Sequence, residues 1–484
     1  MCGIAGKLFY DRGRPVDEEL LRRMCDALEH RGPDDEGYFR DGPLGLCMRR
    51  LQVIDLPGGH QPMSNEDGTL WTVFNGEIYN YRQLRQDLEQ RGHVFKTASD
   101  TETILHLYEE KGWDCVEDLQ GMFAFALWDT REQSLLLARD RLGKKPLFYA
   151  EVDGGLVFSS ELGSLLRDKS VDRALDYQAI DEYLEYLFVP HPRTIFQQVR
   201  KLPPGSRMLC RQGSVEIDRY WQVHYDAVAS IRREEAIEQL DVLLRQAVEM
   251  RMLADVPVGA FLSGGLDSSL VVALMCAVSD QPVRTFAIGF EESSFNELTY
   301  AREVAQALGT EHEEYTVGYQ VEDLIPKILD HFGEPFADSS AIPTYHLSRV
   351  TREQVTVALS GDGGDEVFGG YRRYQARRWA ELFNLWPGWG GRGVCEWGVE
   401  QLKEPATYYG KSWRKKARRF VEFARAVREA PETSWGFFFP TGKKTLCIRK
   451  NLPILSIQKL LRLACKIIFM PDLTPVRRRC FGLI

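Results

Sequence analysis

The sequence lacks several patterns that would place the protein in a specialised class. Its ten cysteines include no CxxC pair, and its nine histidines include no HExxH spacing. In a chain of 484 residues, cysteines scattered in this way indicate reduced thiols and argue against a disulfide framework or a zinc site. The start of the chain lacks a signal peptide's charged and apolar regions, and no apolar run reaches about 18 residues. We therefore predict a cytoplasmic protein without a membrane partner.

The composition is also without a strong charge bias. The net charge of −9 gives no reason to expect a nucleic-acid partner, and a hydrophobic content of 44% with 27% charged residues is ordinary for a globular protein. A chain of 484 residues suggests roughly three domains' worth of sequence, and more simply two large domains.

The most informative stretch of the sequence is Ser263-Gly-Gly-Leu-Asp-Ser-Ser269, here called the phosphate loop. It follows an apolar run that predicts a buried strand and precedes an apolar run that predicts a helix. Gly264 and Gly265 allow a tight turn and a close approach of the backbone to a ligand. The free N–H groups of the helix start and the hydroxyls of Ser263, Ser268 and Ser269 suit a phosphate.

Asp267 does not fit a simple phosphate cradle, because a carboxylate repels a phosphate unless a cation lies between them. Mg²⁺ is the natural cation for such a pair. The plain alternative is a serine- and glycine-rich turn with a capping aspartate. The seven-residue string in this context favours a phosphate site.

Residues 1 to about 205 predict an α+β domain with mostly antiparallel sheets. Short β-type runs alternate with turns, and helices are expected over 17–28, 81–91 and 101–111. If Met1 is removed, Cys2 gains a free α-amine, which can serve as the base for its own thiol. The alternative is a small residue that happens to follow the initiator.

Three further features of this domain describe a site for an amino acid. Asn75 beside Gly76, near a strand end, can form an oxyanion hole. Arg50 offers a fork for a carboxylate, and Asp100 offers an acceptor for an ammonium. Each has a plain alternative: a turn Asn-Gly, a surface arginine and a helix-capping aspartate.

The ordered motifs of this half resemble class II glutamine amidotransferases, N-terminal nucleophile glutaminases with an α/β/β/α sandwich. They are Cys2-Gly-Ile-Ala-Gly6, His30-Arg-Gly-Pro-Asp34, Arg50-Leu51, Asn75-Gly-Glu-Ile-Tyr-Asn80, Gly121-Met-Phe-Ala-Phe-Ala126 and Arg139-Asp-Arg-Leu-Gly143. With the phosphate loop added, the chain resembles the glutamine-hydrolysing asparagine synthetase family. The resemblance implies that Cys2 attacks glutamine while Asn75 and Gly76 hold the oxyanion. It also implies that Arg50, Glu77 and Asp100 bind the backbone end of glutamine.

The second half predicts a doubly wound parallel sheet. After a helix over 234–250, with Ile237, Leu240, Leu243, Leu244 and Val248 on one face, strands and helices alternate. A later strand, 355–359, ends in Ser360-Gly-Asp-Gly-Gly-Asp-Glu366, here called the acidic loop. Both loops are expected at the carboxyl ends of strands, where such folds bind ligands. Helix capping is the plain alternative for the loop acids.

The family resemblance implies the nucleotide site. It assigns ATP to Leu262, the phosphate loop, Ile288, which can lie against an adenine, and Ser360-Gly361. It assigns magnesium to Asp267 and Asp365. Asp362 stands where many members carry Glu, a residue tied to forming the acyl-adenylate, and bacterial relatives also use Asp. The chemistry implied is attack of a carboxylate on ATP to form an acyl-AMP, which ammonia then converts to the amide.

After Gly442 the chain changes character. Residues 443–484 carry ten Lys or Arg against one acid, Asp472. Residues 452–470 could form an amphipathic helix for a membrane surface or a partner. The alternative is a tail unlike the family, produced by a frame change or an early stop. Family members usually continue through a lysine-containing helical segment with a Val-Asp-Arg-Ala-Ser-Met-like string and an Arg-x-Pro-Phe-Leu-Asp-like string, and neither string occurs here.

These features predict a glutaminase domain at 2–205, a linker at 206–234, an incomplete ATP-binding domain at 235–442 and an atypical basic tail at 443–484. Expected substrates are glutamine, ATP and a carboxylate acceptor, with aspartate preferred. A cell-surface glycan or peptide is an alternative acceptor, and a truncated product with glutaminase activity alone is another reading. The resemblance is compatible with a homodimer.

Overall fold

A computed structural model describes residues 1–152, 154–224, 230–290, 296–318, 324–386, 391–401 and 413–429. The chain divides into two compact units. The first holds 1–180, 189–336 and 340–360, and the second holds 181–188, 337–339 and the chain from Gly361 onward. The basic tail at 443–484 lies outside the described residues, so its amphipathic character stays a prediction.

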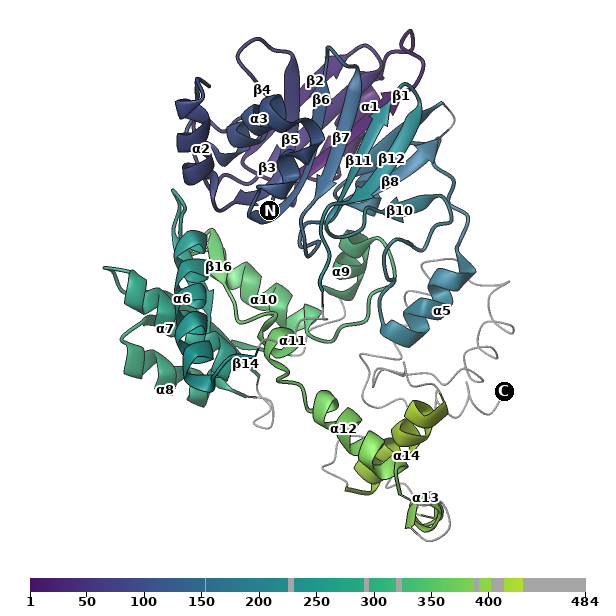
Figure 1. Ribbon diagram of the computed structural model, residues 1–484, viewed down its shortest axis with the longest axis vertical. Coiled ribbons are helices and arrows are strands. Elements are labelled where there is room, and N and C mark those ends of the chain that lie inside the picture. The colour runs from purple at the N-terminus through teal and green to yellow at the C-terminus, as the bar shows by residue number, and fades with distance from the viewer. Residues whose placement is uncertain are drawn as a thin grey trace. The chain divides into compact units, whose positions relative to one another are not determined.

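Two antiparallel six-stranded sheets build the N-terminal half (Figure 1). The first sheet follows the order β10 (Val199–Lys201), β8 (Phe148–Val152), β9 (Gly155–Ser159), β1 (Gly3–Phe9), β3 (Leu44–Arg50) and β2 (Asp35–Asp41). The second follows the order β12 (Ser214–Arg219), β11 (Ser206–Arg211), β7 (Ser134–Arg139), β6 (Gly121–Asp129), β5 (Leu70–Ile78) and β4 (Met63–Ser64). One apolar cluster contains side chains of both sheets, so the sheets pack face to face.

The outer faces are covered by helices. On the first sheet lie α1 (Glu18–Asp26) and α4 (Leu162–Leu165). On the second lie α3 (Asp100–Lys111) and the 3₁₀ turn η1 (Gly112–Glu117), with α2 (Tyr81–Gln90) beside α3. The predicted α/β/β/α sandwich is therefore confirmed.

Strand β6 shows how the sequence specifies this arrangement. Its residues alternate between two cores, since Ala124, Ala126 and Trp128 belong to the cluster between the sheets. Phe123, Phe125 and Leu127 belong to the cluster under α3. A strand with both faces buried carries apolar residues at every position, because its side chains point alternately to opposite faces.

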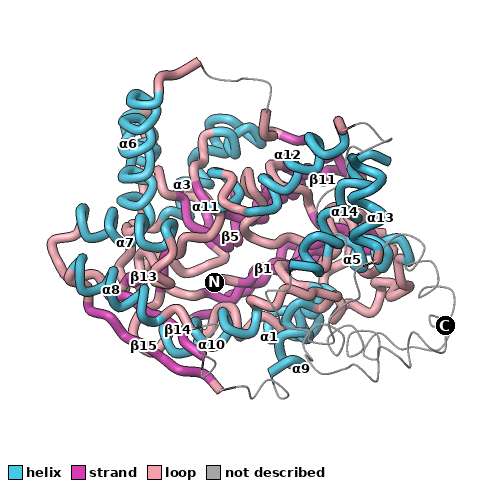
Figure 2. The backbone as a smooth tube through the Cα atoms, turned by 90° about the horizontal axis from the view of Figure 1, so that it is seen from below, coloured by secondary structure: helices cyan, strands magenta, loops and turns pink. Residues whose placement is uncertain are grey.

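The C-terminal half holds a four-stranded parallel sheet in the order β15 (Glu311–Val317), β14 (Arg284–Phe290), β13 (Val258–Phe261) and β16 (Val357–Leu359). Its helices are α6 (Arg233–Arg251), α7 (Leu266–Val278), α8 (Leu298–Leu308), α9 (Leu324–Phe332) and α10 (Ala341–Thr351). Figure 2 shows α7 and α8 beside β13 and β14. The order places a topological switch point between β13 and β16, as in doubly wound sheets. The predicted fold class is confirmed.

The second unit is mainly helical. It contains α11 (Gly364–Phe368), α12 (Arg372–Asn384), α13 (Gly393–Glu400) and α14 (Trp413–Glu429), and it takes in the later part of α5 (Tyr177–Tyr186). A small core forms where α12 and α14 pack, around Ala380, Phe423, Ala424 and Val427.

Two details differ from the sequence-based expectations. The second sheet continues through β11 and β12, inside the stretch 206–234 predicted as a linker. The Pro-rich signal at 201–206 marks the turn into β11, where Gly205 has a φ of 62°. On α6 only Val248 of the predicted apolar face is buried, while Ile237 and Leu243 are 52% and 62% exposed.

The described residues contain no helix that is both long and apolar enough to cross a membrane. Every cysteine among them is a free thiol.

Candidate functional site

Cys2 lies immediately before β1 and is held by one neighbouring residue. Its thiol accepts a hydrogen bond from the Leu51 N–H at 3.4 Å and donates to the Leu51 carbonyl at 3.6 Å. Burial raises the pKa of the Cys2 thiol, and the positive charge of the N-terminal amine opposes this rise. Burial also lowers the pKa of the Met1 amine to about 5. The Met1 amine is therefore neutral near pH 7.

Asn75 and Gly76 lie within β5, which continues to Ile78, so the alternative of an Asn-Gly turn is excluded. Asn75 is fully buried, yet neither its side-chain oxygen nor its nitrogen has a hydrogen-bond partner. A buried amide without hydrogen-bond partners is rare, because no hydrogen bond offsets the free energy needed to remove it from water. The Asn75 amide is thus available to a ligand.

The backbone N–H of Gly76 points to the side of β5 that faces away from β6. Phe74 N–H donates to Gln61 at 2.7 Å and Ile78 N–H donates to Asp100 at 2.8 Å, both away from β6. Alternate residues of a strand direct their N–H groups to the same side, so the Gly76 N–H points there too. A Cβ at Gly76 would lie 2.2 Å from the Met122 carbonyl, which explains the glycine.

Arg50, Glu77 and Asp100 share one buried environment. Arg50 is only 4% exposed, and it donates to the carbonyls of Ile54 and Asp55, both at 2.9 Å. It is therefore not a surface arginine. Asp100 is not the helix cap, because Ser99 caps α3 by accepting from the Thr101 N–H.

The two carboxyl groups of this environment are strongly perturbed. Burial raises the pKa of Asp100 to about 6. Burial, and then the charge of Asp100, raise the pKa of Glu77 well above its usual value. Two carboxylates held close together in a buried place favour a cationic ligand such as an ammonium.

Two basic residues of this region were not predicted as site residues. Lys145 is 4% exposed, and its charge lowers the pKa values of both Cys2 and Glu77. Arg31 donates from Nε to the Cys2 carbonyl at 2.9 Å and from Nη1 to Glu161 at 2.9 Å. Arg31 and the loop residue Asp140, which accepts from the Lys145 N–H, both lie in motifs that carried the resemblance. Membership of these motifs is the sequence signal that could have identified Arg31 and the loop next to Lys145.

The phosphate loop connects β13 to α7 as predicted. Gly264 has a φ of 75°, and a Cβ there would lie 2.5 Å from the Tyr300 backbone at α8. The hydroxyls of Ser263 and Ser268 lie 3.0 Å apart, and Ser268 donates to the Gly265 carbonyl. The Ser269 hydroxyl oxygen is buried without a hydrogen-bond partner. Asp267 lies in the first turn of α7.

The register of the parallel sheet brings further predicted residues to the same edge. Ala260 pairs with Leu359, so Leu262 and Ser360 both follow directly after neighbouring strands. Ile288 lies on β14 two residues beyond Phe286, the partner of Phe261. The start of the acidic loop and the phosphate loop therefore flank the switch point of the sheet.

The rest of the acidic loop belongs to the second unit, from Gly361 onward. Asp365 and Glu366 lie in the first turn of α11, after Gly363 with a φ of 92°. The Tyr371 hydroxyl donates to Glu366 at 2.6 Å. A Cβ at Gly370 would lie 2.0 Å from the Asp365 carboxylate, so this glycine makes room for it. Asp362 stands between Gly361 and Gly363.

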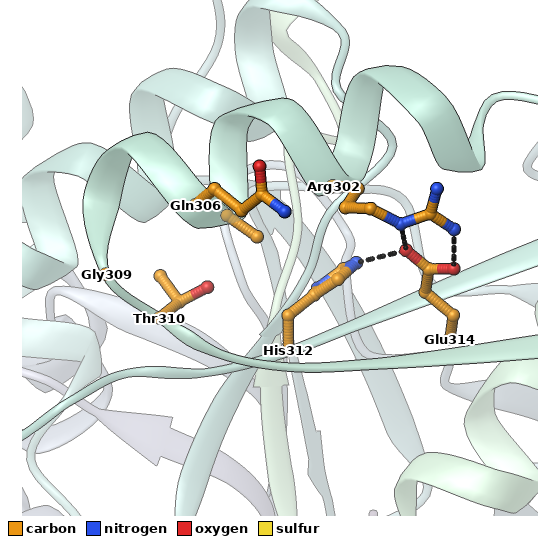
Figure 3. A pocket seen from close by; sticks show the side chains of 7 residues that line it. Arg302, Gln306, Gly309, Thr310, His312 and Glu314 are labelled. Atoms are coloured by element: carbon orange, nitrogen blue, oxygen red, sulfur yellow. Dashed lines mark hydrogen bonds and ion pairs between the residues drawn. The ribbon is translucent and has the colours of Figure 1, made fainter.

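A pocket of about 440 Å³ lies elsewhere, between α8 and β15 (Figure 3). Arg302 is paired there with Glu314, and His312 faces the same carboxylate. The pocket includes Thr310, which precedes β15, whereas the phosphate loop follows β13. None of the residues that line it is a predicted nucleotide residue.

Comparisons with known proteins agree with the two halves. Residues 1–221 match the family model described as a glutamine amidotransferase domain, and residues 239–469 match the one described as asparagine synthase. The second match runs past residue 442, the boundary predicted from the sequence. A solved glutamine phosphoribosylpyrophosphate amidotransferase from Bacillus subtilis, complexed with ADP and GMP, is 17% identical, with a TM-score of 0.34 and 65% of both chains covered.

Full-length relatives are closer in sequence. Asparagine synthetase [glutamine-hydrolyzing] 1 of Bacillus subtilis (strain 168) is 40% identical over 380 residues, 78% of this chain and 60% of that protein. A Methanocaldococcus jannaschii protein named for the same family is 39% identical over 396 residues, 77% of this chain and 76% of that protein. The chain thus spans about 60% of the length of the first relative. It belongs to the glutamine-hydrolysing asparagine synthetase family.

Proposed function

We propose that this chain converts a carboxylate to an amide with ATP, using ammonia released from glutamine, and that aspartate is the acceptor. The observation that carries the glutamine step is the buried Asn75 amide without partners, in the same domain as Cys2. The family assignment supports the ATP step, because both curated relatives are named as glutamine-hydrolysing asparagine synthetases.

In the proposed first step, Cys2 Sγ attacks the side-chain amide carbon of glutamine. After removal of Met1, the Cys2 α-amine takes the thiol proton and passes it to the leaving ammonia. Asn75 Nδ2 and the Gly76 N–H donate to the oxyanion of the tetrahedral intermediate. Water then hydrolyses the thioester to glutamate and restores the thiol.

Arg50, Glu77 and Asp100 would hold the amino-acid end of glutamine. The substrate carboxylate suits the Arg50 guanidinium, and the substrate ammonium suits the Glu77–Asp100 pair. The raised pKa of Glu77 supports this role, because the charge of Asp100 adds to the effect of burial there and a bound ammonium would offset that repulsion.

In the proposed second step, an oxygen of the acceptor carboxylate attacks the α-phosphorus of ATP, giving an acyl-AMP and pyrophosphate. The phosphate loop would receive the pyrophosphate, and the buried, unpartnered Ser269 hydroxyl fits that ligand. Leu262, Ile288, Ser360 and Gly361 would line the ATP site. Ammonia then attacks the acyl carbon, and AMP leaves.

The carboxylates of Asp267 and Asp365 are the donors that Mg²⁺ prefers, and Gly370 leaves room for the second one. These two residues would hold the ion, which neutralises phosphate charge when bound. Asp362 would assist formation of the acyl-adenylate. Ammonia must reach the acyl-AMP before water protonates it, because ammonium is not a nucleophile.

The test compares purified wild-type protein with Cys2→Ala. Wild type should form glutamate from glutamine, and it should release pyrophosphate and AMP with aspartate. Cys2→Ala should lose glutamine hydrolysis completely while keeping pyrophosphate release with free ammonia. Glutamine hydrolysis that survives Cys2→Ala would contradict the nucleophile assignment.

The same assay separates the alternatives. Pyrophosphate release with a glycan or peptide carboxylate, but not with aspartate, would reassign the acceptor. Glutamate formation without AMP from any acceptor would leave glutaminase activity alone. Magnesium dependence of pyrophosphate release, tested with Asp267→Asn, would check the metal assignment.

A further inference from the structure

A cluster of histidines and glutamates, two of them on α3 and two from the preceding segments, lies outside the site described above. It consists of Glu66, His93, His106 and Glu109, here called the α3 histidine cluster. Ligand atoms of Glu66, His93 and His106 all lie within 4.8 Å of one another. His106 is fully buried, and its Nε2 has no hydrogen-bond partner. The proposed reaction uses none of these residues.

The Nδ1 atoms of both histidines converge on one carboxylate oxygen. His106 Nδ1 lies 2.9 Å from Glu109 Oε2, and His93 Nδ1 lies 3.2 Å from the same oxygen. Glu66 Oε2 lies 3.9 Å from His106 Nδ1. Four donors around zinc, with bonds of roughly 2.0–2.1 Å, lie about 3.3 Å apart, so these separations match a tetrahedral site.

An outer carboxylate orients the His93 ring, because His93 Nε2 lies 3.0 Å from Glu110 Oε1. Glu102 Oε1 lies 3.7 Å from His106 Nε2, which is beyond hydrogen-bond distance. Glu109 Oε1 accepts from Asn65 Nδ2 at 2.8 Å. Metal-bound histidines commonly give their second N–H to a carboxylate, which fixes the tautomer and leaves a lone pair for the metal.

The two imidazole rings lie close together, with centroids 4.9 Å apart, and the His106 ring is fully buried. One metal ion bound to both Nδ1 atoms would therefore join two neighbouring neutral rings.

A second group, His30, Glu161 and His331, also has suitable donors. There, however, the Glu161 oxygen already accepts from the Arg31 guanidinium at 2.9 Å. That positive charge opposes a cation. Among the described residues, no arginine or lysine forms an ion pair with a carboxylate of the α3 histidine cluster, and Lys96 Nζ contacts only the Glu66 carbonyl, at 3.3 Å.

We propose that the α3 histidine cluster binds one Zn²⁺ ion, held by two imidazole nitrogens and two carboxylate oxygens. The absence of paired cysteines argues against a zinc site with sulfur ligands, but not against one built from histidine and glutamate. The ion would join the turn at Glu66 and the loop at His93 to α3, whose first residue is Asp100. It is therefore a structural ion that fixes the helix presenting Asp100, and it takes no part in the chemistry.

The experiment uses the full chain, stripped with a chelator and titrated with Zn²⁺ by calorimetry. We expect one Zn²⁺ per chain, bound at micromolar or tighter concentration, and a melting temperature raised by about 5 °C when zinc is saturating. Co²⁺ bound in its place should give the visible absorption of a four-coordinate site.

Three variants test the location. His93→Gln and Glu66→Gln change partly exposed side chains, and each should weaken Zn²⁺ binding at least about tenfold. His331→Gln, in the second histidine group, is the matched control and should bind as wild type does. Circular dichroism checks that each variant is folded.

Two results would overturn the proposal. One is wild-type protein that binds no Zn²⁺ and gains no thermal stability from it. The other is binding that is lost in His331→Gln and kept in His93→Gln and Glu66→Gln. Glutamine hydrolysis is not the readout, so the outcome is independent of the proposed function.

Discussion

At the scale of single residues, a substitution of Asn75 is expected to lower catalysis without lowering stability. Its buried amide has no partner in the folded protein, so Asn75→Ala removes no hydrogen bond. The melting temperature should therefore stay the same or rise slightly. The kcat for glutamine hydrolysis should fall about 10²–10³-fold with little change in KM, because the lost bond forms only with the oxyanion.

Asn80 is the matched control in the same motif. Its amide donates to the Asp118 carbonyl and accepts from the Gln120 N–H, both at 2.9 Å. Asn80→Ala should lower the melting temperature and leave kcat near that of wild type. If Asn75→Ala instead behaved like Asn80→Ala, its amide would be structural and the oxyanion assignment would fail.

Asp100 predicts a pH dependence whose sign follows from its raised pKa of about 6. The unfolded carboxyl has the ordinary, lower pKa, so the folded state loses stability as pH rises through about 6. Asp100→Asn keeps an acceptor for the Ile78 N–H and removes the buried charge. It should raise the free energy of unfolding at pH 7.5 by about 1–3 kcal/mol, and the gain should shrink as pH falls toward 4.

The same change should raise the KM for glutamine, since the substrate ammonium loses a counter-charge. Denaturant titrations at several pH values and glutamine kinetics measure the two effects together. Asp87→Asn, at an exposed position on α2, is the control and should change neither quantity. A stability gain that does not depend on pH would show that the carboxyl of Asp100 is not the cause.

The sequence suggested most residues of the proposed glutamine site but not the electrostatics around them. The Asn75–Gly76 pair, Arg50 and Asp100 could be proposed as site residues because residue type and sequence spacing alone indicate what their side chains can bind. Lys145 and Arg31 were not assigned roles, because their importance depends on burial and on contacts across about thirty residues or more, such as Arg31 with Cys2. Those are tertiary properties that no local pattern carries.

At the scale of elements, the phosphate loop depends on Gly264. This residue combines a φ of 75° with the Tyr300 backbone 2.5 Å from any added Cβ. Gly264→Ala should cost about 2–5 kcal/mol from backbone strain and overlap with α8, and it should abolish pyrophosphate release. Glutamine hydrolysis should survive in the N-terminal half.

Gly309 is the natural comparison, because it has a φ of 66° with nothing within 4 Å of an added Cβ. Gly309→Ala should therefore cost only about 1–2 kcal/mol, the strain of a left-handed alanine, and leave pyrophosphate release unchanged. Thermal melting and a pyrophosphate assay on both variants check the pair. Equal losses would mean that strain alone, and not the approach of α8, requires the glycine at 264.

Most elements could be predicted from the sequence because their burial is periodic or continuous. The helices predicted over 81–91 and 101–111 agree with α2 and α3 to within one residue. The turn that was the plain alternative for Asn75 and Gly76 is excluded, because both lie inside β5, where Gly76 is needed for the close approach of Met122. The prediction for α6 was wrong for a physical reason. The apolar residues of α6 predict a buried face, but burial also requires a neighbouring surface.

At the scale of the whole molecule, the order of two domains was evident from the motifs, while the boundary between them was not. Proline and glycine near residue 205 produce a turn within a sheet as readily as a linker. The contacts that join segments of the first unit far apart in sequence were also invisible. One is Lys201 of β10 with Glu334, after α9, where Nζ and Oε1 are 2.5 Å apart.

This ion pair is nearly buried, with side-chain exposures of 14% and 11%. Burial raises the pKa of Glu334, and the Lys201 charge opposes that rise. Removing one partner leaves a buried charge, so Lys201→Met should destabilise the protein by about 3–5 kcal/mol at pH 7.5. The loss should diminish at lower pH, because the pKa of Glu334 would then lie higher still and the carboxyl would become neutral in the folded state.

A double-mutant cycle tests whether the two residues act as a pair. Lys201→Met with Glu334→Leu removes both charges, so its stability loss should be smaller than the sum of the two single losses. Recovery should be partial, because Lys201 also donates to the Val189 carbonyl and Glu334 accepts from the Ile195 N–H. Urea unfolding of all four proteins at pH 7.5 and 5.5 measures the coupling. Additive losses with no pH dependence would show that packing, and not the ion pair, joins these two distant segments of the chain.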